Sequence, residues 1–276
     1  MILLLLACAQ KADDSALPSD AAPAWYEVRW QTDPDPLAAG APGTFTLQVT
    51  DPDGVPIEDL QQNHERMVHT LVISQDLTSF QHLHHEDFAA LTAEDLRAAT
   101  FHFPLTVPLA GPYLLSFDFA HRDQFQNRTD LLTATGSPAQ ATSPQLPTSD
   151  TAQDGDVIGT LTWDSAPIAG YETSFTVHLT DTDGAPITDL VQWLGADAHA
   201  ALVKADLSWV SHTHAWYPGM ENVTPGMEMP PIYPGPDLPF HYTFPLGGDH
   251  KMWVQFTRAA DPSRVYTLAF AAAVGG

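Results

Sequence analysis

Thirteen of the 276 residues are histidine, and six of them recur with one fixed spacing. In each of two segments, thirteen positions separate the first histidine from the second, and a His-x-His pair completes the set. The six residues are His69, His82 and His84, followed by His199, His212 and His214. Neutral imidazole is the most common metal ligand in proteins and suits copper, zinc, nickel and iron. The repeated triplet therefore predicts metal binding in both segments.

A β-hairpin would bring the first triplet together. The runs HTLVIS (69–74) and FQHLH (80–84) flank a polar segment, 75–78, which is typical of two antiparallel strands joined by a turn. If Ile73 pairs with Phe80, then His69 lies opposite His84, with Cβ atoms about 5 Å apart. Alternate residues share a face of a strand, so His82 lies beside His84. The second segment predicts the same hairpin.

Methionines near both triplets favour copper. Met67 lies two residues before His69, which predicts the same strand face, whereas Asp197 takes the equivalent place in the second segment. A proline-rich stretch after His214 adds Met220, Met227 and Met229. Thioethers are soft ligands that suit copper(I). We therefore expect these four methionines to join the six histidines as metal ligands, with copper as the ion and zinc as the alternative.

A metal-free role for the histidines stays open. A histidine on a strand often only forms a hydrogen bond to the protein, and a methionine is often core filler. The triplets would then be structural clusters of histidine and aromatic side chains. His102, His121 and His178 have no counterpart in the other segment, and we expect them to be ordinary strand or surface residues.

An internal repeat organises the chain around these triplets. Residues 44–60 (TFTLQVTDPDGVPIEDL) match residues 174–190 (SFTVHLTDTDGAPITDL) at an offset of 130. The offset becomes 137 where residues 106–119 match residues 243–256, so the second copy is about seven residues longer. Residues 136–155 between the copies are rich in Pro, Ser, Thr and Ala and are typical of a linker. The predicted division is 1–23, 24–135, 136–155 and 156–276.

Both copies predict β structure. Apolar and polar residues alternate in short runs, separated by turn signals such as Asp53-Gly54 and Asp183-Gly184. This pattern predicts an all-β chain of two tandem immunoglobulin-like antiparallel β-sandwich domains joined by the linker. A short helix is expected within residues 85–99.

The N-terminus resembles a bacterial lipoprotein signal. Leu5-Leu6-Ala7-Cys8 matches a lipobox, in which Cys8 would carry the lipid, and Cys8 is the only cysteine. The residues up to about Pro23 are small, polar and acidic, as in a flexible tether. We therefore expect an exported protein that is attached to the bacterial cell envelope through a lipid anchor, on the periplasmic side or on the outer membrane.

Composition and missing motifs argue against two classes of function, nucleic-acid binding and catalysis. The formal net charge of −24 excludes nucleic acid as a natural partner, because the chain would repel phosphate groups. The sequence lacks a Gly-x-Ser-x-Gly motif, a phosphate-binding loop, a His-Glu-x-x-His motif and a dinucleotide fingerprint, so we expect no enzyme. The expected partners are a metal ion, the membrane through the anchor, and an envelope protein.

The stretches MVHTLVISQDLTSFQHLHHED (67–87) and FPLTVPLAGPYLLSFDF (103–119) resemble the YtkA-like family of exported bacterial domains. The resemblance implies an immunoglobulin-like sandwich in a copper or heavy-metal context. It carries over onto Met67, His69, His82 and His84, and in the second copy onto His199, His212 and His214. The leading hypothesis is thus an exported, lipid-anchored protein that binds, buffers or delivers copper. The alternative is a metal-free tandem immunoglobulin-like interaction or structural module of the cell envelope.

Overall fold

The computed structural model describes residues 26–215 and 233–276. The first domain contains β1 (Glu27–Asp33), β2 (Gly43–Thr50), β3 (Val68–Ser74), β4 (Phe80–Leu83), a short 3-10 helix η1 (His85–Asp87), α1 (Ala93–Ala98), β5 (Thr100–Leu105), β6 (Gly111–His121) and β7 (Gln124–Ala134). The second contains β8 (Thr151–Asp154), β9 (Val157–Trp163), β10 (Glu172–Asp181), β11 (Leu190–Val191), β12 (His199–Lys204), β13 (Val210–His214), β14 (Asp237–Thr243), β15 (Gly248–Arg258) and β16 (Asp261–Val274). The fold is two tandem β-sandwich domains, as the alternating pattern predicted.

The first domain packs a three-stranded sheet, β1-β2-β5, against a four-stranded sheet, β4-β3-β6-β7. The aromatic side chains of Phe45, Phe101, Phe103 and Phe117 fill the space between them and are almost completely buried. The predicted short helix is confirmed as η1 and α1. A capping box at Thr92 starts α1, because the Thr92 hydroxyl accepts from the Asp95 amide while the Asp95 carboxylate accepts from the Thr92 amide.

The second domain repeats this plan with sheets β14-β10-β9-β8 and β11-β15-β12-β13, the latter extended by β16 beside β15. Its own apolar core includes Phe175, Phe240, Phe256 and Phe270. The strand β8 falls inside the range 136–155 that the sequence predicted as linker, and it pairs with β9. The connection between the two sandwiches therefore runs from the end of β7 to Thr151. Within the described residues, no helix has the length and apolar character needed to cross a membrane.

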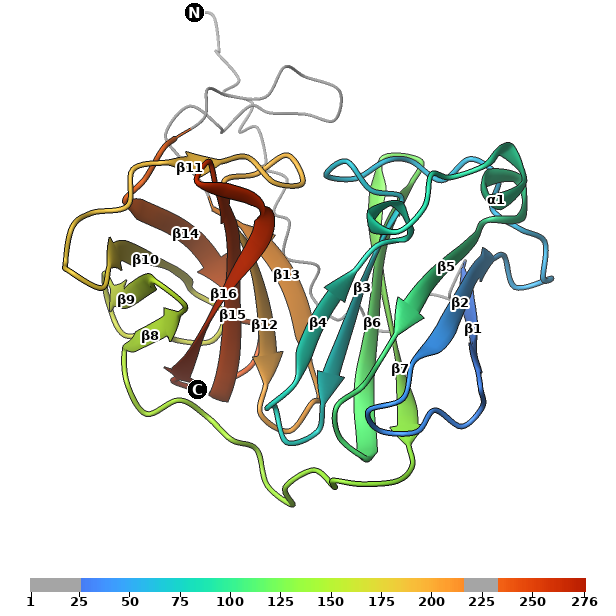
Figure 1. Cartoon of the computed structure of the whole chain (residues 1–276), viewed down its shortest axis with the longest axis horizontal. Coiled ribbons are helices and arrows are strands. Elements are labelled where there is room, and N and C mark those ends of the chain that lie inside the picture. The colour runs from blue at the N-terminus through green and yellow to red at the C-terminus, as the bar shows by residue number, and fades with distance from the viewer. Residues whose placement is uncertain (1–25, 216–232) are drawn as a thin grey trace, which may run out of the picture.

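The two domains lie side by side, and the hairpins β3-β4 and β12-β13 meet between them (Figure 1). A third apolar cluster joins the outer faces of these two sheets. Its buried members are Leu71, Ile73, Leu77 and Leu114 from the first domain, and Ala201, Val203, Val210 and Trp253 from the second. Phe80 stacks on Trp253 across the interface, with ring centroids 4.8 Å apart. Every residue of β3 is buried, because the sandwich core covers one face of the strand and the second domain covers the other.

Polar contacts add to this docking. Lys251 of β15 donates from Nζ to the carbonyl oxygen of Leu77, in the turn of the first hairpin, and to that of Gln145 in the connection, 3.2 Å away. The same connection is bonded to the first domain, because the amides of Ala141 and Gln145 donate to the side chain and to the carbonyl of Asp76. The hairpin turn, the connection and β15 are therefore joined at one place.

Candidate metal centre at the domain interface

The first hairpin brings the first histidine triplet together as predicted. Ile73 pairs with Phe80 and Leu71 with His82, which confirms the expected register. The Nδ1 atom of His69 lies 3.0 Å from Nε2 of His82 and 2.9 Å from Nε2 of His84. The two Nε2 atoms of His82 and His84 are 3.0 Å apart. Three ring nitrogens thus form a triangle whose sides are nearly equal.

The outer nitrogens of His69 and His84 fix where their protons lie. Nε2 of His69 donates to the carbonyl oxygen of Asn63 at 3.0 Å, and Nδ1 of His84 donates to the Asp87 carboxylate at 2.6 Å. Both oxygens can only accept, and a neutral imidazole carries one proton. When both rings are neutral, the inward nitrogens of His69 and His84 present lone pairs to each other across 2.9 Å. Two lone pairs at this distance repel unless a cation or a proton lies with them.

His82 completes the arrangement with a partner from the other domain. Its Nδ1 lies 3.1 Å from the side-chain oxygen of Gln255, whose amide nitrogen in turn donates to Thr267. This chain of contacts orients the Gln255 amide so that its oxygen accepts from His82. The Nε2 atom of His82 then also offers a lone pair toward the centre. A metal-binding histidine usually donates from its other ring nitrogen to a carboxylate, a carbonyl or water, and this hydrogen bond directs the lone pair toward the metal.

The spacing of the nitrogens fits a metal ion. Two nitrogens bound about 2.05 Å from a zinc ion at tetrahedral angles are about 3.3 Å apart. The triangle in the first domain, with sides of 2.9–3.0 Å, needs only a small expansion to reach that separation. Imidazole nitrogen suits both copper and zinc.

The second hairpin forms a similar set. His199 pairs with His214, and Ala201 pairs with His212, as the repeat predicted. Nδ1 of His199 lies 3.1 Å from Nε2 of His212, while Nε2 of His199 donates to the carbonyl oxygen of Trp193 at 2.8 Å. The Nε2 atom of His214 is buried and has no hydrogen-bond partner within the part of the chain that the structure describes. Together the three residues offer ligand atoms within 4.8 Å of one another.

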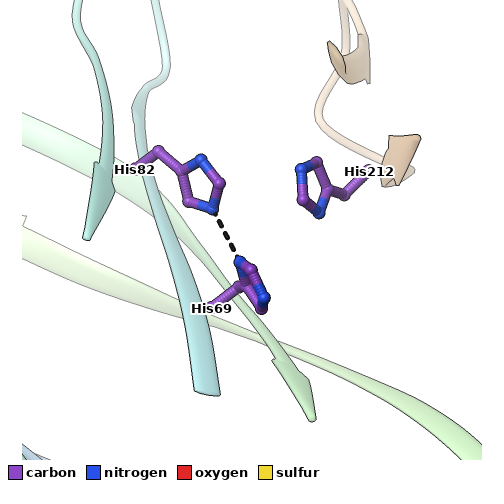
Figure 2. Close-up of side chains that lie close together, drawn as sticks. All are labelled: His69, His82 and His212. Carbon is purple, nitrogen blue, oxygen red and sulfur yellow. Dashed lines mark hydrogen bonds between the residues drawn. The ribbon is translucent and has the colours of Figure 1, made fainter. Parts of the chain in front are cut away.

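The two sets meet at the interface, which the sequence analysis did not foresee. His69, His82 and His212 also offer ligand atoms within 4.8 Å of one another, so the group spans both domains (Figure 2). The ring of His212 approaches His69 and His82 from the second domain. Its centroid lies 4.9 Å from that of His82 and 5.4 Å from that of His69. The repeat thus builds one combined site where two separate sites were expected.

His64 also belongs to the histidine cluster at the interface, although the sequence analysis did not predict it. It occupies a tight turn in which His64 and Glu65 both have positive φ angles, 46° and 64°. This turn directs the His64 ring onto His214 of the second domain, with centroids 3.7 Å apart. The same turn supplies the Asn63 carbonyl oxygen that accepts from His69. The equivalent turn of the second domain carries Leu194 in place of His64, also at positive φ.

Burial keeps these imidazoles neutral. Desolvation lowers the pKa values of His69, His82, His212 and His214 well below the usual value, and neighbouring histidines lower them further. The pKa of His199 falls to about 3 for the same main reason. A neutral imidazole keeps the lone pair that metal binding requires. At neutral pH these five histidines therefore keep a lone pair on one ring nitrogen.

One of the four predicted methionine ligands, Met67, lies within the described residues. Met67 precedes β3 and packs, partly buried, against the apolar core of the first domain. Its role as a metal ligand stays a prediction. Met220, Met227 and Met229 lie outside the described residues, as does Cys8.

The other histidines serve local contacts. His121 is buried and bonds Tyr26 and Asp59, whereas His102 contacts Thr46 and His178 contacts Asp237.

Asp197 stands beside the second histidine triplet at the position equivalent to Met67. Asp197 is buried, and desolvation raises its pKa to about 6, while one of its oxygens accepts from the Tyr233 amide.

Comparisons with known structures give distant matches. The adhesin FdeC of Escherichia coli is 16% identical over 90% of this chain and 64% of its own, with a TM-score of 0.27. The adhesin InvE of Yersinia pseudotuberculosis is 13% identical over 88% of this chain and 58% of its own, with a TM-score of 0.24. The chain thus spans less than two thirds of the length of either. Likeness at this level does not carry a function from those proteins to this chain.

The family comparison is stronger. No curated protein sequence matches the chain. One family model, described as a domain of unknown function (DUF8832), matches residues 22–135 and again residues 151–276. These two ranges follow the two sandwiches, and the comparisons show no link to YtkA-like domains. The chain belongs to the DUF8832 family and contains its domain in two tandem copies.

Proposed function

We propose that this protein binds a transition-metal ion through the histidines at the interface of its two domains. The observation that carries the proposal is the contact between His69 Nδ1 and His84 Nε2, 2.9 Å apart. In the neutral form of each ring this atom is an acceptor, because the opposite nitrogen of the ring donates to an oxygen. A cation among His69, His82 and His84 would satisfy all three inward lone pairs at once.

Copper is the proposed ion and zinc the alternative. Both suit a set of neutral imidazoles, which brings no negative charge of its own. Binding, buffering or delivery of the ion needs no further chemistry from the chain. The lipobox-like residues Leu5 to Cys8 support a place at the bacterial cell envelope, with a lipid on Cys8 as the anchor. Within this proposal the protein is a metal carrier or buffer and has no catalytic activity.

Titration of the full chain with copper(I), copper(II) and zinc(II) tests the proposal. The comparison is a variant with His69, His84, His199 and His214 all changed to Ala. A matched control changes His102 and His178, which contact Thr46 and Asp237 away from the cluster. We expect tight binding by the wild type and the control and a loss of more than 100-fold in the cluster variant. Equal affinity in all three proteins would overturn the proposal.

A second candidate is a metal-free interaction or structural module. The observation that favours it is that His69, His84 and His199 are buried and bonded to protein oxygens, and that Trp193 packs against His82 and His199. A proton shared among the inward nitrogens would then replace the ion. The module would present its acidic surface to an envelope partner. Wild-type protein that binds no metal in the titration, yet keeps its domains docked, would favour this function.

A further inference from the structure

The second histidine set has the features that mark the first as a metal site. Nε2 of His199 donates to the Trp193 carbonyl, so its Nδ1 presents a lone pair to Nε2 of His212, 3.1 Å away. His214 contributes a buried Nε2 atom that has no hydrogen-bond partner among the described residues. An unpartnered buried nitrogen beside two others is costly in an empty site, because it has lost its contact with water. This donor set therefore calls for an ion of its own.

The two sets are too close to be independent. The rings of His82 and His212 meet edge to face, with centroids 4.9 Å apart. A nitrogen of His212 lies within 4.8 Å of the ligand atoms of His69 and His82. The contact is reciprocal, because His82 also lies 6.1 Å from His199 between ring centroids. Ions bound to the two sets would be neighbours within one shared site.

The first domain also contributes directly to the second set. His64 lies against His214, with ring centroids 3.7 Å apart, and its centroid is 6.1 Å from that of His199. The tight turn that fixes Asn63 also fixes His64, so the same turn supports both sets. Leu194 stands at the equivalent place in the second domain, so the two sets differ in their surroundings.

We infer that the interface holds a dinuclear centre, with one ion at His69, His82 and His84 and a second at His199, His212 and His214. This inference rests on the proposed function and extends it from one ion to two. Ions of low charge suit the centre best. At a given separation two divalent ions repel each other four times as strongly as two monovalent ions, and the six imidazoles bring no negative charge to offset this. The structure thus favours a pair of copper(I) ions.

Anaerobic titration of the full chain with copper(I), in competition with a chromophoric copper(I) chelator, tests the inference. We expect two ions per wild-type chain and one ion each in His84→Ala and His214→Ala, which remove one ligand from the first and second set. His178→Ala, outside the cluster, should keep two. A single ion in the wild type, lost in both cluster variants, would overturn the dinuclear centre and leave the proposed function intact. No bound ion in the wild type would overturn both.

A measurement on the wild type alone guards against variants that misfold. Anomalous X-ray diffraction at the copper edge, from crystals of the full chain loaded with two equivalents of copper(I), should show two copper peaks among the six histidines. The chain loaded with one equivalent gives the comparison. A single peak among these histidines at two equivalents would overturn the inference.

Discussion

His82 and His212 occupy equivalent positions in the two repeats, and their rings meet edge to face across the domain interface, with centroids 4.9 Å apart and an interplanar angle of 76°. Each also approaches the first histidine of the opposite triplet: His82 approaches His199, and His212 approaches His69. The same strands carry the apolar residues that dock the domains. The histidine cluster and the apolar docking surface therefore lie on the same strands of both domains.

Metal should stabilise the folded chain. An ion that binds only the native state at about 100 times its Kd raises the free energy of unfolding by about 2.7 kcal/mol. We expect differential scanning calorimetry to show a higher Tm with zinc(II) than without, rising further with zinc concentration. A chelator should reverse the shift. A Tm that does not respond to zinc(II) or to copper would contradict metal binding to the native state.

Removal of one leucine at the interface should separate the domains. Leu114 belongs to the cluster between the domains, and its neighbour Leu115 belongs to the core of the first domain. Either change to Ala is expected to cost about 2–5 kcal/mol. Only Leu114→Ala should split thermal unfolding into two transitions and weaken metal binding that spans both domains. Leu115→Ala is the matched control, and equal loss of metal affinity in the two variants would argue against a shared site.

Acid should destabilise the metal-free protein. Burial holds the native pKa values of His69, His82, His199, His212 and His214 below the usual 6.5. Below pH 6.5 the unfolded chain binds protons that the native chain does not, so the free energy of unfolding falls as the pH falls. Each such group contributes up to about 1.4 kcal/mol per pH unit.

Two carboxyl groups oppose this trend. Burial raises the pKa values of Asp118 and Asp197 to about 6, so between pH 6 and 4 the native chain holds protons that the unfolded chain has lost. Five histidines outweigh two carboxyls, and the net effect is a loss of stability toward acid. Urea unfolding of metal-free protein from pH 7.5 to 4.5 measures it. Stability that is constant or rises over this range would show that the histidines are not held neutral.

The partner of His84 should tune metal affinity. Asp87 accepts from Nδ1 of His84 and also binds Arg66. Asp87→Asn should weaken metal binding by about 10–100-fold, the usual effect of changing an outer-shell partner. Asp59→Asn is the control, because Asp59 bonds His121 away from the cluster. Similar affinity in the two variants would indicate that Asp87 does not act through His84.

The local geometry of the site was accessible from the sequence. The spacing of His69, His82 and His84 predicted their convergence, because the register of a hairpin follows from its turn and from strand alternation. The stretch Leu71-Val72-Ile73 also departs from strict alternation. Three consecutive apolar residues place apolar side chains on both faces of a strand, and the second domain covers the outer face of β3.

Other features depend on tertiary contacts that spacing does not encode. His64 enters the site through a tight turn at positive φ, and Gln255 enters from a strand 173 residues away from His82. The joining of the two triplets into one site needed the relative placement of the domains, which no local pattern specifies.

The reciprocal contacts at the interface have a consequence for the origin of the chain. A surface that meets its own equivalent is self-complementary, which is the property of a symmetric homodimer. A single repeat produced alone would expose Leu71, Ile73 and Leu114 and would pair with a second copy through the same strip. Fusion of two such copies then fixes their ratio at one to one. It also frees each half to diverge, as His64 and Leu194 have done at the same turn.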